Sequence, residues 1–557
     1  VGVANSGGPD STCLLFLVQR YLTDLNAETS TIIKPKRLIS LTVDHDLQVS
    51  SAAAASQCAT QATRIGASYI TSKIPWGQPP FPPRPVEGDA FEKIAREARY
   101  HQLLMAMKSW KPSGAEKDSS TGAINIIAFG HHADDQMETS LMRLGMGTTA
   151  LGARGMRYCR RWGMGFGSGD GSLGFAGMDG MDKWIIRPLL DITKDRILAT
   201  CETHGLEYVI DKSNFQPHIT LRNALRMAIH DPKQAKLSTL PPPMTEQLNK
   251  IDTTLRGLNG VDVSLASGSN ALRSALQQMT DEIQNIERRV DSAIRRSILP
   301  SPQGTCLLSS RALATVQDPL VRASMLLRIM RYVSFHPWGS LRADGNRRRS
   351  SLHQIIGNLW NPNPFDSGLS LFVAGGGVLW SPVIFREGKI KTYERVNNIG
   401  IGPGDTPAWL ASRQPPIHKR AMAIADRPNP LVLDITDDLL WQISNRASAS
   451  WEVLYDFRFL LHFDLDKIPQ PLIEAIQSGA RIIIRPYTRW YWPHVLSESG
   501  ESSTLIHSHL QPSTSDTGLG ESANVLSENP RHCWKPSKPS LESGWITTKW
   551  IRPLADV

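Results

Sequence analysis

The first 230 residues alternate short apolar runs with longer segments of helical periodicity. This pattern is typical of an α/β fold in which crossover helices connect the strands of a parallel sheet. Strands are predicted at Val1–Ala4, Leu38–Val43 and Ile124–Phe129, and helices at Thr12–Leu22, Ser50–Ile65 and Asp89–Trp110. The segment Gly163–Gly180 is rich in Gly, Ser and Asp and lacks apolar periodicity, which predicts a flexible insertion.

The pattern changes after residue 235. Pro241, Pro242 and Pro243 mark a break, so a linker is predicted at 236–262. Apolar residues then recur every three or four positions from Leu272 to Ile298, which predicts an amphipathic helix. A second helix is expected at Arg311–Val333. These elements predict a mainly helical domain over 263–400 and a mixed region over 401–557. The Ser- and Pro-rich stretch 497–540 is expected to be a loop or disordered.

Composition narrows the class of protein. A chain of 557 residues needs several domains, and a net charge of +9 favours a polyanionic partner. The six cysteines are scattered and form no CxxC pair, which argues against a zinc ribbon, a cluster held by paired cysteines or a disulfide framework. No apolar run approaches the ~20 residues of a membrane-spanning helix, so no membrane partner is expected.

The segment Ser6-Gly7-Gly8-Pro9-Asp10-Ser11 lies between the first strand and the first helix. Small residues let the backbone approach a phosphate, and a helix N-terminus presents unpaired N–H groups. Asp10 repels phosphate directly, so a divalent cation is the expected intermediary. The Gly-Lys-Ser/Thr of a Walker loop is absent. Taken alone, the segment is also compatible with a simple turn and helix cap.

The segment resembles the signature of the PP-loop ATP pyrophosphatases, a family with an adenine nucleotide alpha hydrolase-like fold. Further segments resemble the tRNA(Ile)-lysidine synthetase family in the same order. They are Val43-Asp44-His45, Ala95-Arg96-Glu97-Ala98-Arg99-Tyr100, His131-His132-Ala133-Asp134-Asp135-Gln136-Met137-Glu138-Thr139, Arg187-Pro188-Leu189-Leu190, and Asp211-Lys212-Ser213-Asn214 with Leu221-Arg222-Asn223 and Arg226. The resemblance spans about residues 1–230, so a catalytic domain is expected over 1–235.

This resemblance implies a two-step ligation that uses ATP and Mg²⁺. O2 of the wobble cytidine of a tRNA(Ile) with a CAU anticodon attacks ATP and releases pyrophosphate. The amine of free L-lysine then displaces AMP at C2 and gives lysidine. The family's later domains hold the tRNA, a role expected here for 263–400, with Arg288-Arg289, Arg295-Arg296 and Arg347-Arg348-Arg349 as candidate phosphate contacts.

The resemblance also assigns roles to residues. Ser6, Gly7, Gly8, Pro9, Asp10 and Ser11 are expected to bind ATP, with Asp10 holding the metal. Asp135 and Glu138, one helical turn apart, are expected to bind lysine. The other expected catalytic residues are Arg96, His132 and Arg222, while Tyr100 is expected to pack in the core.

Some positions depart from the family pattern, and alternatives stay open. Asn5 stands where a small or apolar residue is usual, and Gln48 and the Arg143–Gly147 loop also differ. A tRNA thiolase with the same loop would need a reactive cysteine, and a catalytically silent tRNA-binding protein would need no intact loop. The first visible residue is Val1, and the insertions resemble eukaryotic elaborations. We therefore expect the mitochondrial matrix as the compartment, or otherwise the cytoplasm. Oligomeric state is not predicted.

Overall fold

The computed structural model describes the chain in two compact units, Val1–Ile286 and Glu287–Asp556. The boundary falls inside helix α9 (Gly268–Ser297). The described residues are 1–27, 37–48, 50–86, 91–110, 124–145, 155–165, 176–209, 220–230, 240–257, 263–340, 342–343, 349–361, 370–392, 402–416, 429–445, 448–509 and 544–555.

The first unit is built on a six-stranded sheet with the order β3-β2-β1-β4-β6-β5. Its strands are β1 (Gly2–Ala4), β2 (Ile39–Asp44), β3 (Ser68–Lys73), β4 (Ile126–Ala128), β5 (Cys159–Arg161) and β6 (Trp184–Ile186). All neighbours pair in parallel except β5, which runs antiparallel to β6. The predicted parallel α/β sheet is therefore confirmed, with an antiparallel edge strand that the sequence pattern did not predict.

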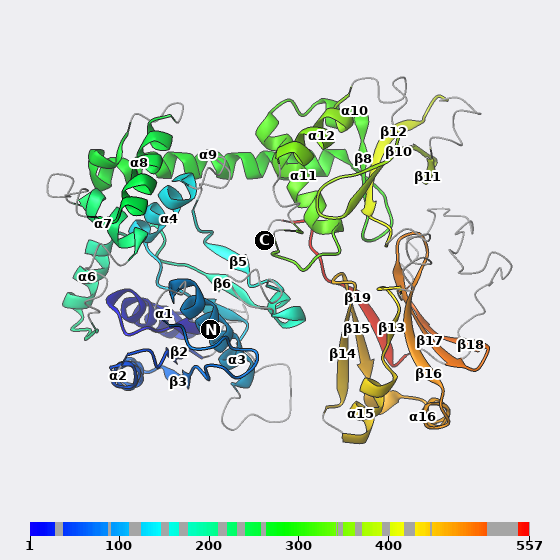
Figure 1. Ribbon diagram of the computed structural model, residues 1–557, viewed down its shortest axis with the longest axis horizontal. Helices are drawn as coiled ribbons and strands as arrows, with labels where there is room; N and C mark the ends of the chain where they lie inside the picture. The colour runs from blue at the N-terminus through cyan, green and yellow to red at the C-terminus, as the bar shows by residue number, and fades with distance from the viewer. Residues whose placement is uncertain are drawn as a thin grey trace. The chain divides into compact units, whose positions relative to one another are not determined.

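Helices cover this sheet and extend beyond it (Figure 1). They are α1 (Pro9–Ala27), α2 (Ser51–Ile65), α3 (Phe91–Ser109), α4 (Ala133–Gly145), α6 (Lys194–Thr203), α7 (Leu221–His230) and α8 (Pro242–Arg256), with the short 3₁₀ turns η1 (Gly177–Met181) and η4 (Leu265–Ser267). One apolar cluster, which includes Leu14 and Ala128, packs against α1, and another, which includes Tyr100 and Ile127, packs against α3. These contacts fix the helix ends that surround the functional site.

The predicted linker at 236–262 is wrong for most of its length, because α8 occupies Pro242–Arg256. Proline is tolerated in the first turn of a helix, where its missing N–H has no intrahelical partner anyway. Leu248, Ile251 and Leu255 of α8 are buried in a cluster with Met137 and Leu141 of α4. The amphipathic helix predicted after it is confirmed as α9. The predicted insertion 163–180 lies partly outside the described residues, and its flanks are joined by Gly163 N–H donating to the Gly180 carbonyl (2.9 Å).

The second unit combines helices with three antiparallel sheets. Its helices are α10 (Ser310–Ala314), α11 (Pro319–Val333), α12 (Arg349–Leu359), α15 (Thr436–Asn445) and α16 (Gln470–Gln477), with the 3₁₀ turn η6 (Leu465–Lys467). Its strands are β7 (Ile298–Leu299), β8 (Cys306–Ser309), β9 (Phe372–Val373), β10 (Val378–Arg386), β11 (Lys389–Thr392), β12 (Thr406–Arg413), β13 (Leu433–Asp434), β14 (Ser450–Tyr455), β15 (Phe459–Asp464), β16 (Arg481–Tyr487), β17 (Trp492–Ser499), β18 (Ser502–Ser508) and β19 (Ile546–Trp550).

Three predictions for this unit need correction. The helix predicted at Arg311–Val333 is split, because the Asp318 side chain caps α11 by accepting from the N–H groups of Leu320 and Val321. The range 263–400 is not mainly helical throughout, since β7–β11 lie within it and β10 is a largely apolar run. The stretch 497–540 begins as strand: β17 and β18 pair up to Ser508, and the cross-strand partners Leu496 and Leu505 are both buried. Residues 510–543 lie outside the described residues.

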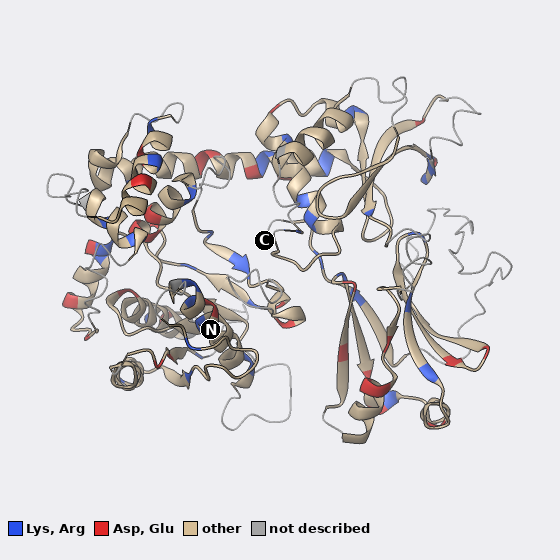
Figure 2. Ribbon diagram, viewed as in Figure 1, with Lys and Arg blue, Asp and Glu red and all other residues tan. Residues whose placement is uncertain are grey.

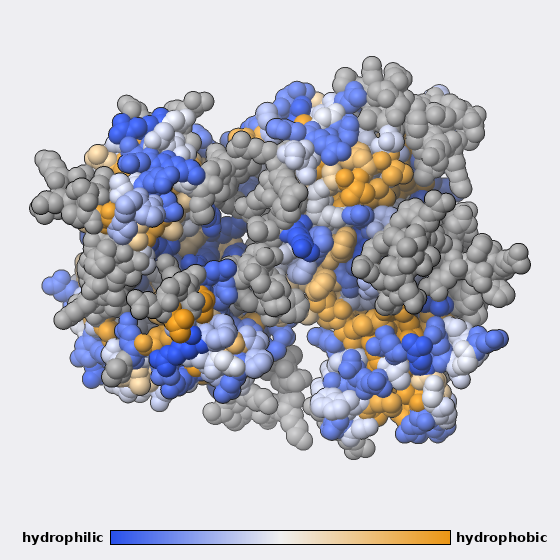
Figure 3. Space-filling view, in the orientation of Figure 1, coloured by the Kyte–Doolittle hydropathy of each residue, from blue (hydrophilic) through white to orange (hydrophobic). Residues whose placement is uncertain are grey.

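The tryptophans of this unit mostly pack. Trp338 and Trp492 are buried, and the Trp360 indole N–H donates to the Leu313 carbonyl at 2.7 Å. Figure 3 shows hydrophobic residues on the surface of this unit, and Trp441 on α15 is 56% exposed. Among the described residues, no helix is both long and apolar enough to cross a membrane.

Candidate active site

The carboxyl ends of β1 and β4 meet where the strand order of the sheet reverses. From β1 the chain builds β2 and β3 on one side, whereas β4 and β6 lie on the other side. Ligands of open α/β sheets bind in the crevice at such a switch point. The loop Ser6–Ser11 follows β1, and His131 and His132 follow β4. The two segments singled out by the sequence therefore adjoin each other.

Close packing holds the loop in shape. Gly7 has a φ of +79°, and a Cβ there would lie 2.9 Å from the Cys58 sulfur. Gly130 approaches the loop so closely that a Cβ would lie 2.9 Å from the Asp10 carbonyl carbon. Pro9 begins α1, whose first-turn N–H groups have no intrahelical partner. The loop and this helix end form a cradle of donors suited to phosphate oxygens.

Asn5, one of the departures from the family pattern, supports the loop through hydrogen bonds of its side chain. Its side-chain oxygen accepts from the Gly7 N–H (3.0 Å) and from the Ser11 hydroxyl (3.1 Å). Its amide nitrogen donates to the Ser40 hydroxyl on β2 at 3.1 Å. Asn5 is 3% exposed, and its amide is hydrogen-bonded on both sides. The departure therefore stabilises the loop rather than weakening it.

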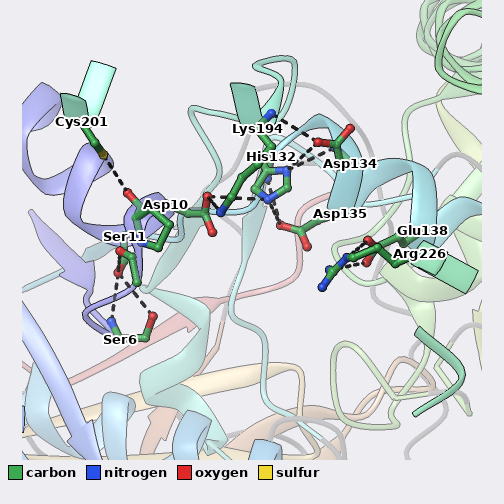
Figure 4. Close-up of polar contacts among 12 residues, drawn as sticks. Ser6, Asp10, Ser11, His132, Asp134, Asp135, Glu138, Lys194, Cys201 and Arg226 are labelled. Atoms are coloured by element: carbon green, nitrogen blue, oxygen red, sulfur yellow. Dashed lines mark hydrogen bonds and ion pairs between the residues drawn. The ribbon is translucent and has the colours of Figure 1, made fainter. Parts of the chain in front are cut away.

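Asp10 contacts both Lys194 and His132, and Figure 4 shows His132 between Asp10, Asp134 and Asp135. Lys194 Nζ donates to Asp10 Oδ1 at 2.5 Å, and His132 Nε2 lies 3.7 Å from the same oxygen. His132 Nε2 also lies 3.4 Å from Asp135 Oδ2. The Asp134 N–H donates to His132 Nδ1 (3.2 Å), so in the neutral ring the proton is on Nε2 and faces the two carboxylates. Three predicted residues, Asp10, His132 and Asp135, thus form one cluster.

Asp134 ties this cluster to a helix far along the chain. Its side chain is 9% exposed, and Oδ1 accepts from Arg273 of α9 at 2.6 Å. The other oxygen, Oδ2, accepts from the Lys194 N–H at 3.3 Å. Asp134 therefore links His132, the first residue of α6 and helix α9 through hydrogen bonds.

Glu138 faces two arginines of α7. Its side chain is 1% exposed and accepts from Arg226 through both oxygens, at 2.8 and 3.1 Å, with Arg222 Nε 3.4 Å away. Burial raises the pKa of Glu138, and the guanidinium of Arg226 only partly offsets it. The pKa of Asp135, by contrast, is lowered: burial would raise it, but His132 and His131 outweigh that effect. The two predicted lysine-binding carboxylates, Asp135 and Glu138, therefore already have cationic or histidine partners in the protein. The ammonium groups of free lysine would have to bind these carboxylates alongside those partners.

Arg96, the remaining predicted residue, lies on an exposed part of α3 beside Tyr100 (5.7 Å from its guanidinium carbon to the ring centroid). Tyr100 packs as expected, stacked on Phe129 with ring centroids 5.4 Å apart. After β6, Arg187 donates from Nε to His131 Nδ1 at 3.2 Å. Burial lowers the pKa of His131 to about 3, so this ring is neutral. Figure 2 shows basic residues on β5.

Sequence reasoning missed Lys194 and Arg273 as members of the site. Lys194 carried a usable signal, because a cation in the first turn of a helix opposes the helix dipole and calls for another explanation. Arg273 carried none, since it contacts a residue 139 positions away. The predicted segment Asp211–Asn214 and Arg347-Arg348 lie outside the described residues. Arg288, Arg295 and Arg296 are exposed, whereas Arg289 forms an ion pair with Asp318 at 2.7 Å.

The carboxylates of this site are better suited to a metal ion that arrives bound to a nucleotide than to a metal ion held permanently by the protein. Within the described residues, no group of three or more His, Cys, Asp or Glu side chains has the arrangement of a metal site. Mg²⁺ is commonly held by one or two carboxylates together with substrate phosphates and water. Asp10, at the edge of the phosphate cradle, suits that arrangement.

Comparison with known proteins agrees with this geometry. Residues 1–232 match the PP-loop domain family. The tRNA(Ile)-lysidine synthase of Clostridioides difficile is 26% identical over 287 residues, covering 51% of this chain and 49% of that protein. That of Novosphingobium aromaticivorans is 31% identical over 214 residues, covering 38% and 51%. That of Bacillus subtilis is 38% identical over 114 residues, covering 20% of each.

The chain thus spans about half the length, or less, of these relatives. A solved U34-tRNA thiolase from Methanococcus maripaludis aligns over 51% of this chain and 73% of that chain at 14% identity. Its TM-score of 0.29 is too low to support an argument. Residues 1–232 therefore match the PP-loop domain family, and the chain is similar to several tRNA(Ile)-lysidine synthases over part of its length.

Proposed function

We propose that this protein uses ATP to activate O2 of the wobble cytidine of a tRNA(Ile) with a CAU anticodon and then joins free L-lysine to C2. One observation carries the proposal: His132 contacts both Asp10 and Asp135. These contacts place the phosphate cradle at Ser6–Ser11 next to the acidic first turn of α4. A phosphate site beside carboxylates suits a reaction between a triphosphate and an amine-bearing substrate.

In the first step, the start of α1 and Lys194 hold the phosphates of ATP. The Lys194 ammonium lies at Asp10, so it adds positive charge where pyrophosphate departs. Asp10 would hold the Mg²⁺ that neutralises the triphosphate. His132 Nε2 faces Asp10 and Asp135, which keeps its proton directed into the site.

In the second step, the carboxylates of α4 receive the lysine. Asp135 is ionised and 16% exposed in its side chain, so it can accept from a lysine ammonium. Free lysine also has a carboxylate. Arg222 and Arg226, which both contact Glu138, can bind that carboxylate as well. The attacking amine must lose a proton, and the carboxylates beside it can accept that proton.

The cysteines argue against the thiolase alternative. A sulfur-transfer enzyme needs a thiol that ionises readily. Burial raises the pKa of Cys13 and of Cys306 to about 12, and it also raises the pKa of the other cysteines within the described residues, Cys58, Cys159 and Cys201.

Pyrophosphate release under omission of single substrates tests the proposal. Release from ATP and Mg²⁺ is expected to require the CAU-anticodon tRNA(Ile) and to proceed for one turnover without lysine, because the adenylate forms first. A tRNA(Ile) with a different wobble base is the matched control and should stay silent. Release that depends on a sulfur donor instead of lysine for turnover would favour the thiolase reading and refute ours.

A further inference from the structure

Arginines from three elements surround one buried tyrosine at the flank of the site. Arg96 and Arg99 lie on α3, Arg160 lies on β5, and Arg187 directly follows β6. Burial by itself would raise the pKa of Tyr100, yet the guanidiniums of these four residues together lower it. The space around the phenol is therefore strongly electropositive.

Within the described residues, carboxylates do not neutralise the arginines that matter most here. Arg96 and Arg160 form no ion pair there, and Arg187 donates to two neutral acceptors, His131 Nδ1 (3.2 Å) and the Arg157 carbonyl (2.8 Å). Burial lowers the pKa of Arg187 to about 10, and the charges of Arg160 and Arg96 add to that effect. Like charges held together out of water destabilise one another, and a bound anion would relieve this repulsion.

One buried donor in this group points to a ligand. The Arg160 Nε is buried and has no hydrogen-bond partner among the described residues. Tyr100 beside it is 1% exposed. Buried donors in folded proteins are nearly always satisfied, so a donor left open beside a cationic group indicates a missing acceptor.

We propose that Tyr100, Arg96, Arg160 and Arg187, which we call the Tyr100 subsite, bind a backbone phosphate of the RNA substrate. This inference rests on the proposed function. The phosphates of ATP already have a cradle at Ser6–Ser11, whereas Arg187 reaches the site through His131, next to the reactive cluster. A polynucleotide presents phosphates on both sides of the reacting nucleotide, and a phosphodiester matches a fork of guanidinium donors with one hydroxyl.

Equilibrium binding of the CAU anticodon stem-loop RNA to Arg160→Gln tests the subsite. The substitution should weaken RNA binding by about tenfold and reduce the slope of log Kd against log salt by about one. Tyr100→Phe, which removes only the hydroxyl, should weaken RNA binding by about fivefold and keep its packing on Phe129. The Kd for ATP should stay unchanged in both variants.

Arg161→Gln is the matched control, because neighbouring strand residues point to opposite faces. The Arg161 guanidinium lies over Trp184 at 4.3 Å and donates to the Met181 carbonyl at 2.6 Å, away from the Tyr100 subsite. Equal losses in Arg160→Gln and Arg161→Gln would overturn the proposal, as would RNA binding by a folded Arg160→Gln at wild-type strength. Loss of ATP affinity instead would assign the subsite to ATP. Wild-type protein that binds this RNA but transfers no lysine would refute the proposed function alone.

Discussion

Replacing Asp10 with asparagine is expected to lower the rate of pyrophosphate release by about 100-fold or more. The substitution keeps the shape of the side chain but removes the charge that pairs with Lys194 and that would hold Mg²⁺. The Kd for RNA should change little, because Asp10 belongs to the phosphate cradle of ATP. A single-turnover assay with labelled ATP measures the rate directly.

Asp24→Asn is the matched control for this prediction. Asp24 lies on the same helix, α1, but it is exposed and distant from the loop in sequence. Its loss should leave pyrophosphate release within about twofold of wild type, as for most surface substitutions. Undiminished tRNA modification by Asp10→Asn, or by the harsher Asp10→Ala, would favour a catalytically silent RNA-binding protein with a vestigial loop.

Replacing Glu138 with glutamine is expected to separate the two steps. The variant should raise the KM for lysine by about 100-fold while single-turnover pyrophosphate release from ATP and tRNA persists. It leaves Arg226 without its carboxylate partner, so a stability loss of about 2 kcal/mol is also expected. That figure is below the loss typical of a fully buried pair, because the Arg226 side chain is 34% exposed.

Steady-state kinetics with lysine varied and tRNA saturating measures this effect. Glu202→Gln on α6 offers a control, since Glu202 is exposed and should leave the KM for lysine unchanged. Thermal unfolding of both variants separates a binding defect from a folding defect. An unchanged KM for lysine in a folded Glu138→Gln would show that Glu138 only positions Arg226.

The parallel sheet and the phosphate cradle were predictable because their signals are local. The cradle lies in six consecutive residues, and the strands are apolar runs of a few residues each. Helix α8 and strands β17 and β18 were not predictable in the same way. Three consecutive prolines, Pro241–Pro243, are as typical of a break as of a helix start. The many serines of β17 and β18 are typical of a loop, and these strands form only because they pair with other strands.

The site was predictable only in part for the same reason. Asp135 and Glu138 lie one turn apart on α4, and His132 directly precedes that helix, so their spacing in the sequence places them together. Lys194 meets Asp10 across 184 positions, and only the packing of α6 against α1 brings them together. The ion pair between Glu138 and Arg226, 88 positions apart, also could not be read from helical spacing.

Transfer of labelled lysine tests the central claim most directly. The protein, ATP and Mg²⁺ would be incubated with labelled L-lysine and a CAU-anticodon tRNA(Ile) transcript, and the RNA would be digested to nucleosides. The account predicts label in the wobble nucleoside, with one AMP and one pyrophosphate formed for each lysine transferred. Pyrophosphate release without any label in the RNA, or label in a transcript whose wobble cytidine has been replaced, would contradict it.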